Sequence, residues 1–419
     1  MKIIILLLLF FLPLSVFAEE RLVELQDGTE IPVEHVAAAG ERVMLWLPSE
    51  FGMSPRQLAV AQGLAESGIE VWMPDLHSGY FIPQGRYSLN ALPPEVLLEL
   101  MQEAQSTSKK QLYVFVSGRM APKTLEAIRL WQMSGVQKEQ LGGAILVSPK
   151  LYVGTPQGGE EAVFIPVARA TNAPVYLFQP ANTAQHWRIN SVVSALEEGA
   201  AQVYLHQLKG VADGFHLRPL DDTEPQEIEL TSRLPAMLNK AIQLLSVTPV
   251  NYASVPVLPE LSAPVKQAAS STLLKPYVGE QPELALKLAD MQGNQFDLAQ
   301  LKNKVVVLNF WATWCPPCVE EIPSLERLRE LMQADGLEVV SIDVGESTAD
   351  IQAFLKDKPV DFPVLLDPEA EAFKSWNGYA FPTTFVLDRE HKIQYAVFGA
   401  FEWDADEVVE MLRQLTESS

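Results

Sequence analysis

The stretch FWATWCPPC, residues 310–318, decides what kind of domain the C-terminal part of the chain forms. It ends the continuous apolar run Val305–Phe310, which predicts a buried strand, and it leads into a predicted helix over Cys315–Gln333. Cys315 and Cys318 are the two cysteines of the chain, and they lie where this helix begins. Unpaired backbone N–H groups and the helix dipole stabilise a thiolate at that place. We therefore expect Cys315 to be the nucleophile and Cys318, one turn further on, to close a disulfide with it.

A purely structural role for the two cysteines is the alternative. A disulfide across two intervening residues closes almost no loop entropy and would add little stability. A four-ligand zinc site would need a second pair of ligands. Pro316 and Pro317 cost no helical hydrogen bond, because N–H groups of the first turn have no acceptor within the helix. A redox site without metal or cofactor is the favoured interpretation.

The motif and two downstream features resemble a known family. FWATWCPPC, then Pro323, then FPTTF at residues 381–385 resemble the thioredoxin fold, and more narrowly the TlpA/ResA branch of exported thiol-disulfide oxidoreductases. The resemblance covers about residues 276–419. It implies that Pro382 is cis beside the disulfide and belongs to the catalytic site, where neighbouring backbone docks a substrate peptide. The substrate-binding candidates are Trp314, Phe381 and Thr383.

Two further positions bear on the resemblance. Plain thioredoxins carry a buried aspartate six residues before the first cysteine, and this chain has Asn309 there. The TlpA/ResA branch places a glutamate three residues after the second cysteine, and Glu321 matches it. A carboxylate in a mostly apolar pocket should have a raised pKa and could exchange protons with Cys318. The alternative is a solvated helix residue, as we expect for Glu320. The segment from about Ser347 to Trp376 matches the insertion typical of this branch.

Residues 1–18, MKIIILLLLFFLPLSVFA, are typical of a secretory signal peptide. Lys2 precedes the apolar run Ile3–Leu12, Pro13 interrupts it, and cleavage is expected before Glu19. The run is short for a membrane span of roughly 20 residues, which disfavours an uncleaved anchor. We expect an exported chain, periplasmic in a bacterium, that is not a membrane protein once the signal peptide is removed.

Composition and charge narrow the function classes. The 419 residues are 48% hydrophobic and 20% charged, which is typical of two or three globular domains. Lys and Arg total 31 against 53 Asp and Glu, and the formal net charge is −22. A field of that sign repels phosphate backbones and argues against nucleic-acid binding.

The chain is predicted to contain two folded domains. Residues 1–18 are the signal peptide, 19–245 an α/β domain, 246–275 a linker rich in Pro, Ser and Ala, and 276–419 the thioredoxin-like domain. Over 19–245, strand-like runs alternate with segments of helical spacing, which predicts a mostly parallel sheet covered on both faces. The fold class is therefore α/β, with a doubly wound N-terminal sheet joined to a thioredoxin-like domain.

The order of elements in 19–245 resembles an α/β-hydrolase that has lost its nucleophile. After the predicted strand Leu112–Val116 the chain reads SGRMA, residues 117–121, where that family has a serine between small residues. Arg119 holds the nucleophile position, and Ser117 would be misplaced. The acid position offers Asn182, and of the triad only His216 fits, although a core or surface histidine is the simpler interpretation. We expect a binding module whose Arg119 could bind a carboxylate.

The leading interpretation is a thiol-disulfide oxidoreductase that reduces periplasmic protein disulfides, with the first domain selecting a partner. The resemblance implies that its partners are exported proteins with disulfides or C-x-x-C thiols, such as apocytochrome c in cytochrome c biogenesis, and a membrane thiol electron donor. A serine-type hydrolase with an accessory thioredoxin domain is an alternative that Arg119 disfavours. A non-catalytic binding protein is another, which the intact Cys-Pro-Pro-Cys motif disfavours.

We predict that no serine between Glu19 and Leu245 reacts with a fluorophosphonate probe. Acyl transfer needs an activated hydroxyl or thiol at a strand-to-helix turn, and Arg119 supplies neither. Mass spectrometry of the labelled full-length protein checks this. Stoichiometric labelling of a serine in that range would instead establish the hydrolase alternative.

Overall fold

The computed structural model describes residues 18–85, 87–135, 140–154, 156, 161–250, 255–259, 274–279, 281 and 286–417. Residues 1–17 of the predicted signal peptide and most of the predicted linker, 246–275, lie outside these ranges. The chain forms two compact units. The first gathers residues up to Pro149 with Ala173–Tyr176 and Gly214–Val255, and the second gathers Lys150–Asn172, Leu177–Asp213 and Pro256–Ser419. Two segments that precede the linker therefore group with the C-terminal part.

An eight-stranded sheet with the order β1-β2-β4-β3-β5-β6-β7-β8 precedes the linker. Strands β1 and β2 form an antiparallel hairpin, β2 and β4 are antiparallel, and β4, β3, β5 and β6 pair in parallel. Every residue of β4 is buried, as expected for a strand covered on both faces. The strands are β1 (Ala18–Glu24), β2 (Glu30–Val36), β3 (Arg42–Trp46), β4 (Ile69–Pro74), β5 (Gln111–Ser117), β6 (Leu141–Val147), β7 (Val175–Asn182) and β8 (Val203–Ala212).

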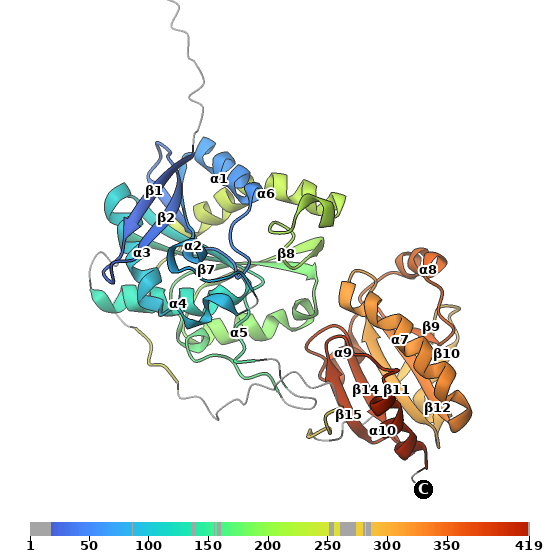
Figure 1. Ribbon diagram of the computed structural model, residues 1–419. Coiled ribbons are helices and arrows are strands. Elements are labelled where there is room, and N and C mark those ends of the chain that lie inside the picture. The colour runs from blue at the N-terminus through green and yellow to red at the C-terminus, as the bar shows by residue number, and fades with distance from the viewer. Residues whose placement is uncertain are drawn as a thin grey trace, which may run out of the picture. The chain divides into compact units, whose positions relative to one another are not determined.

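Helices cover this sheet in two groups. Helix α1 packs against α6, α3 packs against α4, and the two pairs lie on opposite sides of the strands (Figure 1). The sequence analysis did not predict α6, which contains Pro235 and buries Leu234, Leu238, Ile242 and Leu245 on one face. The helices are α1 (Pro55–Glu66), α2 (Leu76–Tyr80), α3 (Pro94–Ser108), α4 (Ala121–Ser134), α5 (Ile189–Glu198) and α6 (Pro225–Ser246).

A second, seven-stranded sheet has the order β10-β9-β13-β12-β11-β14-β15. Strand β11 lies parallel to β12 and antiparallel to β14, so the chain reaches the cysteines from a fully buried central strand. Strands β9 and β10 form an antiparallel hairpin, and strand β13 was not predicted from the sequence. The strands are β9 (Lys287–Asp290), β10 (Gln295–Asp297), β11 (Val305–Trp311), β12 (Leu337–Val344), β13 (Val364–Asp367), β14 (Thr383–Leu387) and β15 (Ile393–Phe398).

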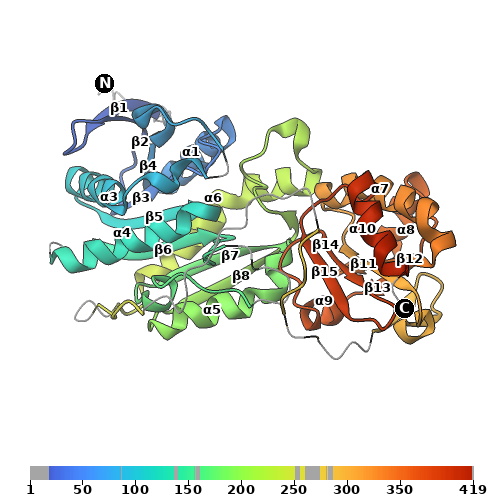
Figure 2. The ribbon, with the colours of Figure 1, turned by 60° about the horizontal axis from the view of Figure 1, so that its bottom comes forward.

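Alternate residues of β11 supply two separate hydrophobic cores. Val305, Val307 and Trp311 pack in the cluster that also holds both cysteines, whereas Val306, Leu308 and Phe310 pack on the other face with Phe373. Figure 2 shows α7 and α10 on one side of β11 and β14, and α9 on the other. The side chain of Asn309 therefore belongs to the face of the cysteines. The helices are α7 (Pro316–Met332), α8 (Thr348–Asp357), α9 (Glu371–Ser375) and α10 (Asp406–Glu417).

The predicted mixed α/β architecture is confirmed for the C-terminal part of the chain. Within the ranges that the structure describes, no helix is both long and apolar enough to span a bilayer.

Candidate active site

The two cysteines are joined by a disulfide at the N-terminus of α7. Cys315 is the N-cap residue in extended conformation, and Pro316 and Pro317 occupy the first helical positions, where no N–H bond is lost. The Cys318 backbone N–H donates to Cys315 Sγ over 3.3 Å. Cys315 is 5% exposed and Cys318 1%. The Cys315 sulfur is therefore both the more accessible one and the one that a backbone donor would stabilise as a thiolate.

Glu321 lies one turn beyond Cys318 on α7 and is 2% exposed. Burial raises the pKa of its carboxyl group to about 8, against the lowering effect of hydrogen bonds from Trp403, the Phe401 backbone and Asn309. The interpretation of Glu321 as a solvated helix residue is thereby wrong, whereas Glu320 is exposed as expected. The carboxyl group holds its proton over most of the physiological pH range.

Two side chains from other elements fix the orientation of Glu321. Trp403 Nε1 donates to its Oε1 over 2.6 Å, and Asn309 Nδ2 donates to its Oε2 over 3.1 Å. Asn309 Nδ2 also lies 2.8 Å from Thr384 Oγ1, on the neighbouring strand β14. The residue at the place of the missing aspartate therefore positions the glutamate. Trp403 was not predicted, because no spacing rule connects a loop after β15 to a residue on α7.

A second carboxylate holds the loop just before Cys315. Glu346 accepts hydrogen bonds from the Thr313 backbone N–H (2.6 Å) and from Thr313 Oγ1 (2.5 Å). Asp343, 1% exposed at the end of β12, lies near Glu346, and burial together with that negative charge raises its pKa well above the usual range. Neither acid was predicted. Sequence position alone could not show that the turn after β12 reaches Thr313.

The predicted substrate-binding residues are only partly available at the surface. Trp314 and Phe381 are half-buried and meet edge to face with ring centroids 5.5 Å apart, and Phe381 stacks on Phe373 at 4.7 Å. The Phe381–Pro382 bond is cis, as the motif implied. The Thr383 side chain is fully buried and donates to the Ala380 carbonyl, so it holds the loop instead of facing a substrate. The aromatic pair remains the candidate docking surface.

The described residues contain no group of three or more His, Cys, Asp or Glu side chains that could hold a metal ion.

The turn after β5 differs from the sequence expectation in three ways. Ser117 Oγ lies 2.9 Å from His216 Nε2, a contact that was not predicted from the sequence. The residue with positive φ at the strand-to-helix turn is Gly118 (φ 64°), not Arg119, and glycine has no side chain to act as a nucleophile there. Arg119 lies 3.6 Å from Glu50 and over the ring of Tyr87, so its guanidinium already has a carboxylate partner.

Both members of this serine–histidine pair are buried. Ser117 is 7% exposed and His216 1%, which agrees with the interpretation of His216 as a core histidine. Ser117 is the serine on which the fluorophosphonate experiment reports most directly.

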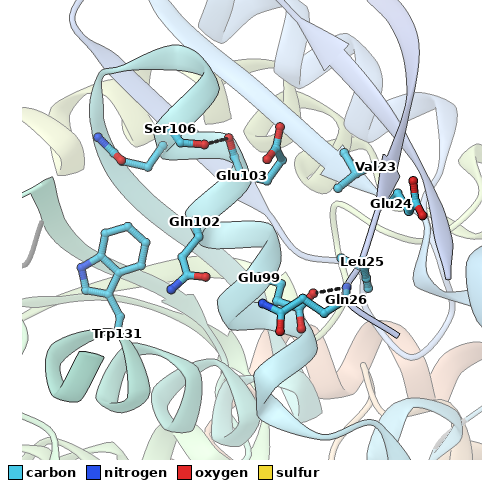
Figure 3. Close-up of a pocket in the computed structure, with 10 residues that line it drawn as sticks. Val23, Glu24, Leu25, Gln26, Glu99, Gln102, Glu103, Ser106 and Trp131 are labelled. Carbon is cyan, nitrogen blue, oxygen red and sulfur yellow. Dashed lines mark hydrogen bonds between the residues drawn. The ribbon is translucent and has the colours of Figure 1, made fainter. Parts of the chain in front are cut away.

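The first unit also contains a pocket between the end of β1 and helices α3 and α4 (Figure 3). Gln26 N donates to Glu99 Oε2 over 2.7 Å. The lining contains no cysteine or histidine. The lining residues are Val23, Glu24, Leu25, Gln26, Glu99, Gln102, Glu103, Gln105, Ser106 and Trp131.

Comparison with known proteins gives matches to redox proteins. A family model described as Redoxin matches residues 277–414. The thiol-disulfide oxidoreductase ResA of Bacillus subtilis (strain 168) is 38% identical over 112 residues, which are 27% of this chain and 63% of that protein. The ResA protein of Bacillus thuringiensis subsp. konkukian (strain 97-27) is 31% identical over 129 residues, which are 31% of this chain and 73% of that protein.

A solved structure gives a further likeness. The secreted thiol-disulfide isomerase from Corynebacterium glutamicum is 31% identical, over 33% of this chain and 86% of that chain, with a TM-score of 0.30. The chain spans less than two thirds of the length of the Bacillus subtilis relative described above.

We predict that Glu321→Gln weakens the pH dependence of folding stability in the oxidised protein. The folded-state pKa is raised from 4.5 to about 8, so the stability that the neutral acid contributes is fully present below about pH 4.5 and is lost as the pH rises through about 8. The variant should lose less free energy of unfolding over this window, with a difference on the order of a few kcal/mol, since one pKa unit corresponds to about 1.4 kcal/mol. Denaturant titrations at a series of pH values measure it.

The matched control is Glu320→Gln, which changes the same charge at an exposed position of the same helix. It should keep the wild-type pH dependence. If the free energies of unfolding of wild type and Glu321→Gln changed with pH in the same way, the buried carboxyl group would not have a raised pKa.

Proposed function

The chain belongs to the family of ResA thiol-disulfide oxidoreductases, and from that membership we propose that it is an exported reductase of protein disulfides acting through Cys315 and Cys318. One observation carries the proposal. A two-cysteine disulfide at a helix N-terminus lies one turn from a buried carboxyl group whose pKa is raised to about 8.

The first step uses the reduced form of the site. The Cys315 thiolate attacks one sulfur of a substrate disulfide, that S–S bond breaks, and the departing substrate sulfur leaves as a thiolate. A mixed disulfide between Cys315 and the substrate results. The Cys318 N–H that points at Cys315 Sγ and the helix N-terminus both favour the attacking thiolate.

The second step resolves the mixed disulfide. Cys318 loses its proton and attacks Cys315 Sγ, the bond to the substrate breaks, and the second substrate sulfur leaves as a thiolate. Two electrons have then passed to the substrate, and the Cys315–Cys318 disulfide has formed. Glu321 in its ionised form accepts the Cys318 proton, and a pKa of about 8 lies close to the value of about 8.5 for an ordinary thiol. Proton transfer between groups of matched pKa costs little free energy.

Continued turnover needs a donor of two electrons. We propose a membrane thiol protein as that donor, and exported proteins with disulfides or C-x-x-C thiols, such as apocytochromes c, as the acceptors. The apolar N-terminal stretch of residues 1–18 supports export to the periplasm.

The region before the linker is proposed to be a non-catalytic α/β-hydrolase-like module that selects a partner. The strand order β1-β2-β4-β3-β5-β6-β7-β8 and the antiparallel β2 support this. A hydrolase function is not favoured, because the turn after β5 presents glycine where a nucleophile is required.

Mixed-disulfide trapping tests the proposed function. The reduced full-length wild-type protein should reduce the disulfides of insulin, and Cys315→Ser should abolish this activity. Cys318→Ser should accumulate a covalent adduct with the substrate, visible on a non-reducing gel, because the resolving thiol is absent. Adducts formed by Cys315→Ser instead would reverse the two assignments, and an inactive wild-type protein would reject the function.

Glu321→Gln tests the proton route in the same assay. The rate should fall by roughly a hundredfold, the lower end of the range for loss of a general acid or base. Glu320→Gln should remain at the wild-type rate. Equal rates for the two variants at every pH would remove Glu321 from the mechanism.

A further inference from the structure

Two segments that precede the linker contact loops of the redox domain within the second unit. One is the 3₁₀ turn Ala184–Arg188, and the other comprises Tyr152, Ala162 and Phe164, where Tyr152 and Phe164 form an isolated β-bridge. Their contacts concentrate on two loops: residues 374–379, which lead into Phe381 and Pro382, and the turn at Gly345 after β12.

Arg188 makes three contacts with the first loop. Its Nε donates to the Gly378 carbonyl over 2.8 Å, its Nη2 donates to the Lys374 carbonyl over 3.4 Å, and its guanidinium lies 3.8 Å from the ring centroid of Tyr379. A planar guanidinium can donate in its plane and stack on its face at once, which a lysine cannot do. This combination fixes both the backbone and a side chain of the loop.

Tyr379 is held from the other side as well. Its hydroxyl accepts the Ala162 backbone N–H over 3.3 Å, and the ring of Tyr152 lies 6.5 Å away, edge on. Burial raises the pKa of Tyr152 to about 12, which agrees with its enclosed position.

Trp187 makes the contact with the second loop. A Cβ atom built on Gly345 would lie 2.3 Å from Trp187 Cζ2, so only glycine lets the indole approach this closely. Gly345 also has φ +83°, which favours glycine independently. The indole ring packs against the core cluster that contains Phe310, Phe373 and Trp376.

Both contacted loops lead directly to the disulfide. Tyr379 precedes Phe381 by two residues, and Phe381 meets Trp314 at the candidate docking surface. Gly345 precedes Glu346, which holds Thr313 two residues before Cys315. One short turn from the first half of the chain therefore contacts both loops that border the redox site.

We propose that Trp187 and Arg188 are positioning residues that pre-organise the peptide-docking loops of the redox site. The inference rests on the proposed function, since it assigns a role in docking a protein disulfide. A loop held in its binding conformation loses less conformational entropy when an extended peptide docks on it. This smaller entropy loss favours binding of protein substrates, which dock on the loops. Small disulfides do not benefit, because they need only an accessible Cys315 sulfur.

The test is a comparison of Arg188→Ala with wild type in the full-length protein. For insulin, KM should rise by roughly fivefold while kcat stays within twofold, the scale expected for loss of a stacked, hydrogen-bonded guanidinium. The rate with 5,5′-dithiobis(2-nitrobenzoic acid), a small disulfide, should stay within twofold. The matched control is Arg233→Ala, because Arg233 is an exposed arginine of α6 that pairs with Glu229 of the same helix.

Hydrogen–deuterium exchange gives the second readout, and it separates the positioning role of Arg188 from the proposed redox function. Arg188→Ala should exchange faster at residues 345–346 and 378–381 while β11 stays protected. Unchanged exchange and unchanged KM in an active protein would overturn the positioning role and leave the redox function standing. An inactive wild type would reject the function, and faster loop exchange would still establish the contact. If Arg188→Ala does not fold, Tyr379→Leu removes the same stacking from the other partner and must give the same result.

Discussion

A carboxyl group buried one turn from a disulfide is the constraint on which the site depends. Placing an ionised carboxylate in an apolar interior is costly, so the group keeps its proton instead. Glu321 can remain there because Trp403 and Asn309 donate to its two oxygens. Asn309 supplies a donor where an aspartate would add a second charge. The loop that carries Trp403 is itself held by Ser324 of α7, whose hydroxyl accepts the Trp403 N–H. Helix, central strand and distal loop therefore meet at one carboxyl group.

The two sides of the disulfide are organised by different acids. Glu321 lies on the helix side in the interior, where we propose that it exchanges a proton with Cys318. Glu346 lies on the strand side and holds Thr313 with both carboxylate oxygens, which fixes the approach of the chain to Cys315. The ring of Trp314, the residue between Thr313 and Cys315, meets the ring of Phe381. The proposed proton carrier and the proposed docking surface are thus different side chains.

The sequence predicted those parts of the structure that local rules govern. The buried strand β11 and the helix that begins at the cysteines follow from residues close to one another in the chain, whereas the cis bond at Pro382 was implied by the family resemblance. Contacts between distant segments could not be predicted, because spacing does not show which loops meet. Trp403 beside Glu321 and Glu346 beside Thr313 are of that kind. The contact between Ser117 and His216 was missed for the same reason, because it depends on how two distant loops fold back and not on the local motif. Helix α6 was missed although its apolar residues repeat at helical spacing.

Titration of the Glu321 carboxyl group tests the central claim most directly. The full-length oxidised protein is labelled with glutamate carrying ¹³C in the side-chain carboxyl, and NMR spectra are recorded from pH 3 to pH 10 for wild type and Glu321→Gln. We predict one resonance, absent from the variant, that titrates near pH 8. A resonance assigned to Glu321 that titrates near pH 4.5 would show that the carboxyl group is ionised at neutral pH, and would contradict the buried proton carrier on which the mechanism depends.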